Sequence, residues 1–271
     1  MKNEKGKFIK IFDDLYNFGN ISNPRDLKIL ELENYNYGFE PYERFCNFES
    51  RKLNLKYIKK EFLWYLNGDK HDSSITKYAK MWKDLVNKDG SINSNYGQYI
   101  FGEQKQFERC LNTLIKDKDS RRASIIILNK EHLNSDTKDY PCTYSINFRI
   151  RGNQLHMTIR MRSQDVIFGM GNDAPCFSFI HEMMYNLLKN TYKNLEYGYY
   201  YHSADSFHVY ERHFETMNNI ILKDDKFEDI NVPKISGYNE AKFLMDNLIN
   251  KKIEIPKKYE FCNWLKSDDK V

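Results

Sequence analysis

The sequence predicts an α+β fold in which a central β-hairpin leads into a long buried helix. The hydrophobic residues repeat with a helical period of about 3.6 in the first part of the chain and with a strand period of about 2 beyond residue 120. No internal repeat and no Pro/Gly/Ser-rich linker divides the 271 residues. The whole chain, residues 1–271, is therefore expected to form one domain.

The first part of the chain is predicted to be mainly helical. Asn67-Gly68 is a helix-stop signal, because glycine accepts the left-handed conformation that ends many helices. The elements expected here are a strand over Leu27–Leu32, a helix over Asn54–Leu66, a second helix over Ile75–Val86 before the turn Lys88-Asp89-Gly90, and a third helix over Phe107–Ile115.

The central part of the chain is predicted to form strands. Gly152-Asn153 is typical of a tight hairpin turn. The pattern predicts a buried strand at Ser124–Leu128, a strand that alternates Cys142, Tyr144, Ile146, Phe148 and Ile150 onto one face, and a return strand that alternates Leu155, Met157, Ile159 and Met161. It then predicts a helix marked by Phe177, Ile180, Met183, Met184, Leu187 and Leu188.

Composition argues against several classes of protein. With 42 Lys and Arg against 38 Asp and Glu, the net charge of +4 is too small to favour a nucleic-acid partner. The longest apolar run, Ala123–Leu128, is far too short for a membrane span, and the charged N-terminus shows no signal peptide. Five unevenly spaced cysteines without a CxxC pair, and histidines without ligand spacing, predict neither disulfides nor a metal site. The expected location is a reducing cytoplasm.

Several arginines are candidates for binding an anion. Arg121 and Arg122 are adjacent forked donors suited to phosphate or carboxylate, although an ordinary solvated pair would look the same. Arg162, Ser163 and Asp165 lie together at the end of the return strand, which is typical of a site rather than of a core.

Cys142 and Glu61 are candidates for catalysis. Cys142 is either one more buried thiol or a nucleophile, which would need positive charge nearby. Glu61 lies between Tyr57 and Trp64 on one row of its helix, where a carboxylate is costly unless it is satisfied. It is either a poised general acid or base or one partner of a salt bridge.

Two further features are open to more than one interpretation. Asp173, two residues before Pro175, is a plausible helix N-cap, and a cap can also contact a ligand. His208 and Tyr210, two residues apart, are a weak signal when taken alone.

Taken in order, six such pieces resemble the thymidylate synthase family over roughly Glu43–Phe214. They are residues 60–68 (KEFLWYLNG), Asn95-Tyr96-Gly97, Asp119-Ser120-Arg121-Arg122, Pro141-Cys142, Arg162-Ser163-Gln164-Asp165 with Gly169, and His208-Val209-Tyr210. The closer likeness within the family is to the phage enzymes that hydroxymethylate deoxycytidylate, which also have Thr after the cysteine. The N-terminal forty residues and the segment after Phe214 match poorly.

The resemblance implies a thymidylate synthase-like domain with a mixed sheet, flanking helices and a homodimer formed back to back through the sheets. It implies a pyrimidine nucleotide monophosphate as substrate and 5,10-methylenetetrahydrofolate as co-substrate, without a metal, in the cytoplasm (the host's, if a phage encodes the chain). Arg121 and Arg122 would reach the partner's nucleotide phosphate. Within the subunit it implies Arg162, Ser163 and Arg25 for the phosphate, His208 and Tyr210 for the sugar, and Asp165, Trp82, Gly169 and Tyr96 for the folate.

In the reaction that the resemblance implies, Cys142 adds to C6 of the base, Asp173 hydrogen-bonds N3 and N4, and Glu61 organises water and proton transfers. The uracil-specific members have Asn where this chain has Asp173. Because cytosine reverses the donor and acceptor of uracil, this exchange favours a cytosine nucleotide, most simply dCMP. The alternatives are a CMP hydroxymethylase, a thymidylate synthase or dUMP hydroxymethylase, and a catalytically inactive nucleotide-binding regulatory dimer.

Overall fold

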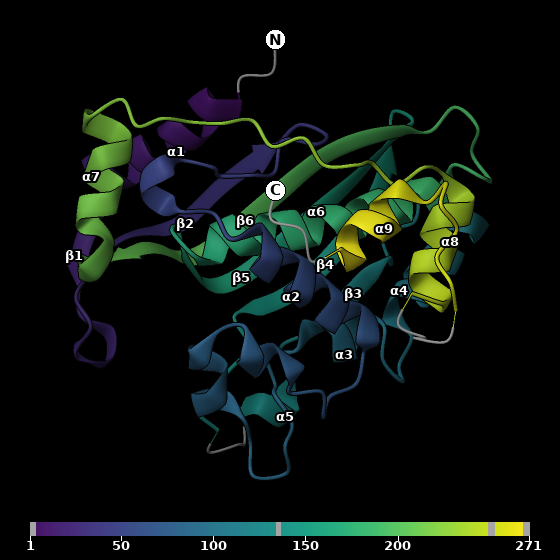
Figure 1. Cartoon of the computed structure of the whole chain (residues 1–271), viewed down its shortest axis with the longest axis horizontal. Coiled ribbons are helices and arrows are strands. Elements are labelled where there is room, and N and C mark those ends of the chain that lie inside the picture. Colours follow the sequence, from purple (N-terminus) through teal and green to yellow (C-terminus); the bar gives the residue numbers. More distant parts are fainter. Residues whose placement is uncertain (1–3, 134–136, 249–252, 268–271) are drawn as a thin grey trace.

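The computed structural model describes residues 4–133, 137–248 and 253–267 of the chain. Their strands form a six-stranded mixed sheet in the order β1-β2-β6-β5-β4-β3, with helices packed against it. The predicted α+β class is therefore confirmed. Figure 1 shows α1 and α7 at the end of the molecule where β1 lies, and α8 and α9 at the opposite end.

The sheet joins strands that lie far apart in the sequence. β5 and β6 are parallel neighbours, whereas the other adjacent pairs are antiparallel. Because β5 and β6 are parallel, their carboxyl ends meet at the same edge of the sheet. The strands are β1 (Asn20–Ser22), β2 (Ile29–Phe39), β3 (Ser124–Ile126), β4 (Thr143–Arg151), β5 (Gln154–Asp165) and β6 (Glu196–Tyr210).

The helices cover one face of the sheet. α6 is buried along most of its length and packs on β5 and β6, while α2, α4 and α8 pack against α6 (Figure 1). The helices are α1 (Glu4–Phe18), α2 (Leu55–Asn67), α3 (Tyr96–Ile100), α4 (Gln106–Lys116), α5 (Lys130–Leu133), α6 (Gly169–Leu188), α7 (Phe214–Leu222), α8 (Tyr238–Asp246) and α9 (Glu260–Lys266). Short 3₁₀ segments are η1 (Pro24–Asp26), η2 (Glu49–Arg51), η3 (Ser74–Lys77), η4 (Lys80–Leu85) and η5 (Glu211–His213).

Local signals predicted the best-defined elements correctly. α2 begins where the Asn54 side chain accepts from the Tyr57 amide, and it ends at Gly68 in the left-handed conformation. The hairpin between β4 and β5 turns at Gly152 and Asn153, both with positive φ. α4 and the strand at residue 124 also form where they were expected.

The predicted helix over Ile75–Val86 is wrong. The chain forms η3 and η4 there, and Ala79 between them is extended. The interruption leaves the Trp82 indole free to donate a hydrogen bond to the Tyr57 hydroxyl, 2.9 Å away, so a tertiary contact replaces a helical turn.

The predicted alternation of β4 is wrong at its first residues. The register shifts between Thr143 and Ser145, as it does at a β-bulge, and Tyr144 is exposed rather than on the buried face of Ile146. The buried alternation holds from Ile146 to Ile150. The irregularity lies next to Cys142, where the chain enters the sheet.

Other elements differ more widely from the expectation. The strand expected at Leu27–Leu32 is the start of the longer β2, and α6 begins at Gly169, well before the marked residues. α1 and β6 were not predicted. α1 buries Phe8, Phe12 and Leu15, so the N-terminal residues belong to the core.

Candidate active site

A cavity of about 390 Å³ opens where the carboxyl ends of β5 and β6 meet the beginning of α6 and one face of α2. β4 runs antiparallel to β5, so the residue before β4 arrives at the same place. The cavity gathers most of the residues singled out in the sequence: Arg25, Glu61, Trp82, Tyr96, Cys142, Ser163, Asp165, Gly169, Asp173, His208 and Tyr210.

Arg162 lines an adjoining cavity of about 630 Å³, which it shares with Arg25, Ser163, His208 and Tyr210. The Arg162 side chain donates from Nε to the Pro141 carbonyl at 3.0 Å and from Nη2 to the Tyr140 carbonyl at 2.7 Å. These bonds hold the guanidinium beside the start of β4 and leave its Nη1 without a partner among the described residues. The adjoining cavity thus has a positively charged wall.

Cys142 lies half-buried in the wall of the first cavity, with its sulfur 3.6 Å from Arg162 Nη2. Burial raises the pKa of the Cys142 thiol, and the Arg162 charge opposes that effect. The thiol of the ligand-free protein therefore keeps its proton near neutral pH. Its position in the cavity wall nonetheless distinguishes it from the other four cysteines, which are buried.

Glu61 has no ion pair among the described residues, so the salt-bridge alternative is wrong. Its side chain is only 4% exposed. Its Oε1 accepts from the Tyr57 hydroxyl at 2.8 Å, and its Oε2 lies 3.6 Å from the Cys176 thiol. Burial raises the pKa of Glu61 to about 7, against hydrogen bonds that lower it. A carboxyl group with this pKa can exchange a proton near neutral pH.

Asp173 is not a helix N-cap, because it lies inside the first turns of α6. The carboxylate at the start of that helix belongs to Asp165, whose Oδ2 accepts from the Phe168 amide at 2.7 Å and from the Gly169 amide at 3.4 Å. Asp173 instead faces the cavity, and burial together with the Glu61 charge raises its pKa well above the ordinary value. Both effects favour the protonated form of the carboxyl group over the charged form.

The remaining residues expected to bind the co-substrate line the other side of the cavity. Trp82 and Tyr96 are buried there, and Tyr96 stacks on Phe177 with a centroid distance of 6.0 Å. A methyl group added at Gly169 would lie 3.7 Å from Asp173 Oδ2. Glycine therefore leaves the space next to that carboxyl group open.

His208 and Tyr210 lie in both cavities, with their rings edge to face at 4.9 Å. The His208 Nδ1 lies 3.3 Å from the Ser206 hydroxyl, and burial lowers the pKa of the imidazole. Arg25, opposite them, is exposed and has a positive φ within η1.

Arg121 and Arg122 do not reach this cavity in the same chain. Arg121 instead lines a groove of about 660 Å³ on the opposite face of the sheet, together with Arg149, Arg151 and Arg160. That groove is the larger cavity, but it holds no cysteine or carboxylate, so it lacks the groups that covalent or acid–base chemistry requires.

Sequence reasoning missed two side chains behind the cavity. Gln164 is 2% exposed and donates from Nε2 to Asp173 Oδ2 at 3.2 Å. Tyr37, on β2, donates from its hydroxyl to Gln164 Oε1 at 2.9 Å. The only signal in the sequence was the position of Gln164 between Ser163 and Asp165, and no local pattern pointed to Tyr37.

Comparison with known proteins identifies relatives of this chain. A family model described as thymidylate synthase matches residues 7–257. The match extends beyond Glu43–Phe214 and takes in most of the N-terminal forty residues and part of the segment after Phe214.

Individual relatives carry related names. The chain is 30% identical to the deoxycytidylate 5-hydroxymethyltransferase of Enterobacteria phage T6 over 194 residues, which are 65% of this chain and 78% of that protein. It is 31% identical to the phage T4 protein of the same name over 60% of this chain and 70% of the relative. It is 27% identical to the deoxyuridylate hydroxymethyltransferase of Bacillus phage SP01 over 75% of this chain and 56% of the relative.

Among residues 4–133, 137–248 and 253–267, no helix is both long and apolar enough to cross a membrane. The same residues contain no group of three or more His, Cys, Asp or Glu side chains arranged to hold a metal ion.

Proposed function

The chain belongs to the thymidylate synthase family, and from that premise we propose that it transfers a hydroxymethyl group from 5,10-methylenetetrahydrofolate to C5 of dCMP. Membership of the family makes it a one-carbon transferase that modifies a pyrimidine nucleotide at C5 with a folate co-substrate. Cytosine as the base, deoxyribose as the sugar and water as the second reactant are the proposal.

The observation that carries the proposal is that Asp173, whose burial favours the protonated form, shares one cavity with Cys142 and Glu61. A protonated carboxyl group can donate to N3 of cytosine from one oxygen and accept from the N4 amino group with the other. An ionised carboxylate would face N3 with a second acceptor, at a cost of about 1–3 kcal/mol. Burial of Asp173, which favours the protonated form, therefore lets this carboxyl group pair with cytosine.

Cys142 is the proposed nucleophile. Addition of its sulfur to C6 makes C5 of the base nucleophilic, and Asp173 hydrogen-bonds N3 and N4 where charge develops. Because the thiol of the free protein is protonated, its proton must leave as the nucleotide binds. Arg162, 3.6 Å from the sulfur, would stabilise the thiolate.

Glu61 is the proposed acid and base. Its pKa of about 7 suits both the removal of the C5 proton and the orientation of an attacking water. Tyr57 occupies one of its oxygens with a hydrogen bond and so keeps the carboxyl group in one orientation.

The cavity wall fits a flat aromatic co-substrate. Met81 and Phe168, which also line the cavity, are 59% and 50% exposed and offer apolar surface for a ligand to cover. With Trp82 they would hold the pterin and aminobenzoyl rings, and Asp165 would hold the pterin. Bound methylenetetrahydrofolate supplies the carbon that C5 receives.

The adjoining cavity would hold the sugar and phosphate. Arg162, Arg25 and Ser163 would bind the phosphate, and His208 with Tyr210 would bind the 3′-hydroxyl. Arg121 and Arg122, which do not reach the cavity of their own chain, would contact the phosphate of a partner in a homodimer formed through the open face of the sheet.

Mass spectrometry of the products tests the proposal. The purified protein is incubated with methylenetetrahydrofolate and, separately, with dCMP, CMP and dUMP. We expect dCMP to gain the mass of CH₂O, with Cys142→Ser as the inactive control. A gain of CH₂ on dUMP would identify a thymidylate synthase instead, and no product from any nucleotide would favour an inactive regulatory dimer.

A further inference from the structure

Two hydrogen bonds link the carboxyl group of Asp173, which we propose contacts the base, to strand β2. Asp173 Oδ2 accepts from Gln164 Nε2 at 3.2 Å, and Gln164 Oε1 accepts from the Tyr37 hydroxyl at 2.9 Å. Gln164, 2% exposed, uses both ends of its amide in these two bonds. The three side chains come from α6, β5 and β2, so only the folded sheet brings them together.

The chemistry of the groups fixes the direction of each bond. Burial raises the pKa of Tyr37 well above its ordinary value, so the phenol keeps its proton. Its hydroxyl has the Gln164 amide as its hydrogen-bond partner, and a buried O–H that did not donate would cost about 1–3 kcal/mol. The phenol must therefore donate to the amide oxygen, which turns the amide nitrogen toward Asp173.

The Tyr37 ring is itself held in place. It lies parallel to the His202 ring, with a centroid distance of 4.8 Å and an interplanar angle of 7°, and it also packs on Phe207 and Phe39. The hydroxyl therefore has little freedom to move away from Gln164.

This orientation matters because a neutral carboxyl group does not by itself distinguish the two pyrimidines. With its proton on one oxygen it matches cytosine, and with its proton on the other oxygen it matches uracil, which presents the reverse order of donor and acceptor. Discrimination requires that the proton stay on one oxygen.

We propose that Tyr37 and Gln164 are specificity-determining residues that hold the Asp173 proton on Oδ1. A carbonyl oxygen accepts a hydrogen bond better than a hydroxyl oxygen does. The amide N–H donated to Oδ2 therefore keeps Oδ2 as the acceptor and leaves the O–H on Oδ1. The carboxyl group then presents one fixed order of donor and acceptor to the base. The inference rests on the proposed function, in which that order matches cytosine.

Tyr37→Phe is the direct test, because it removes the phenol O–H and keeps the ring packing. Without that donor the Gln164 amide can turn over, and the Asp173 proton can occupy either oxygen. We expect the ratio of kcat/KM for dCMP to kcat/KM for dUMP to fall about tenfold or more, through a loss on dCMP and a gain on dUMP. The KM for methylenetetrahydrofolate should not change.

Tyr35→Phe is the matched control. Tyr35 lies on the same strand, and its hydroxyl donates to Asp14 at 2.8 Å rather than toward the site. This variant loses a hydrogen bond of similar length and should keep the wild-type ratio within about twofold. If Tyr37→Phe does not fold, Gln164→Met removes the donor to Asp173 and is expected to lower the ratio in the same way.

The outcomes separate the two proposals. A folded Tyr37→Phe protein with the wild-type ratio overturns the inference and leaves the proposed function intact. Equal changes in Tyr37→Phe and Tyr35→Phe overturn it as well, since they would reflect a general disturbance of β2. A wild-type protein that prefers dUMP overturns the proposed function, and the inference with it.

Discussion

Burial of Glu61 lowers the stability of the folded protein at high pH and gives the carboxyl group a pKa suited to proton transfer. Its pKa is raised from 4.5 to about 7 because the folded protein buries the carboxyl group. The folded state therefore holds the proton more tightly than the unfolded chain does. The free energy of unfolding should fall as the pH rises from 4.5 through 7, by up to about 3 kcal/mol.

Glu61→Gln should remove this pH dependence, because the amide carries no charge at any pH. We expect the variant to be more stable than the wild type at pH 8, with a smaller difference at pH 5, and to lose turnover. Urea unfolding at the two pH values measures the effect, and Glu33→Gln at an exposed position of β2 is the control. Equal differences at both pH values would mean that Glu61 is not the titrating group.

Asp173→Asn tests the reading of the base. The Gln164 amide would hold the new amide oxygen, so the new NH₂ group would take the place of the Oδ1 hydroxyl with the same order of donor and acceptor, but it cannot transfer a proton to N3 as charge develops. We expect kcat/KM for dCMP to fall about 100-fold or more, since transition-state hydrogen bonds of this kind contribute about 2.7–4 kcal/mol.

Thermal stability distinguishes a loss of recognition from a loss of fold in that experiment. Because Asp173 lies inside α6 rather than at its cap, and its burial favours the uncharged form, the amide should leave the melting temperature near that of the wild type. Retained preference for dCMP in a folded Asp173→Asn protein would remove the main reason for choosing cytosine.

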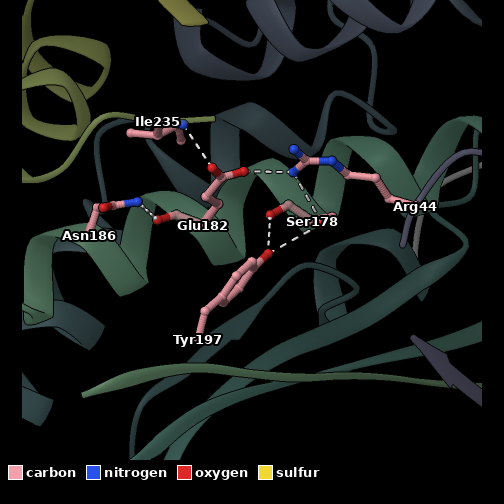
Figure 2. A network of polar contacts seen from close by, with 6 residues as sticks. All are labelled: Arg44, Ser178, Glu182, Asn186, Tyr197 and Ile235. Carbon is pink, nitrogen blue, oxygen red and sulfur yellow. Dashed lines mark hydrogen bonds and ion pairs between the residues drawn. The ribbon is translucent and has the colours of Figure 1, made fainter. Parts of the chain in front are cut away.

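At the scale of elements, a buried ion pair between Glu182 and Arg44 connects α6 to the segment after β2. Glu182, 0% exposed, accepts from Arg44 Nη1 at 2.7 Å and from the Ile235 amide at 2.8 Å, while Arg44 is 2% exposed (Figure 2). Tyr197 on β6 donates to the Ser178 carbonyl one helical turn away. The network joins α6 to the sheet and to the segment before α8.

Arg44→Met should therefore be strongly destabilising. It leaves the Glu182 carboxylate buried without its cation, which costs about 3–5 kcal/mol. Chemical denaturation measures the loss. The control is Lys5→Met, which breaks an ion pair whose side chains are 39% and 93% exposed and should cost no more than about 1 kcal/mol. Similar losses in the two variants would show that burial does not set the strength of the Arg44 pair.

At the scale of the whole molecule, the residues predicted for the site lie on two opposite faces of the sheet. Cys142 lies in the cavity on the helix side, whereas Arg121 lines the groove on the other face with Arg149, Arg151 and Arg160. A second chain applied to this face would bring arginines toward its partner's phosphate site, as we propose for the homodimer.

Mixing two inactive variants tests this arrangement. Arg122→Ala lacks a phosphate contact and Cys142→Ser lacks the nucleophile, so a mixed dimer can contain one site free of both defects. We expect activity to return when the two proteins are mixed under conditions that exchange subunits, and not when either is treated alone. Exchange without recovered activity would show that the arginine acts within its own chain or not at all.

Local pattern in the sequence was sufficient for several elements of the fold. Asn54 and Gly68 set the ends of α2, and Gly152-Asn153 set the hairpin, because caps and turns depend on neighbours in sequence. Most of the motif residues line one cavity, because strand ends and the start of a helix converge at one edge of the sheet, whereas Arg121 and Arg162 do not line it.

Tertiary structure decided what depends on contacts between distant segments. Ile75–Val86 has a helical pattern, yet the chain forms two 3₁₀ segments there instead of one α-helix. In this conformation Trp82 donates a hydrogen bond to Tyr57. Asp173 has the sequence context of a cap but lies within α6, because Asp165 accepts the first amides of that helix. The bond from Tyr37 to Gln164 joins residues 127 positions apart. The sequence by itself determined which groups are present and which local bonds they prefer. Packing across the sheet determined which of these groups are buried and which are hydrogen-bonded to one another, because distant segments come together only when the strands assemble.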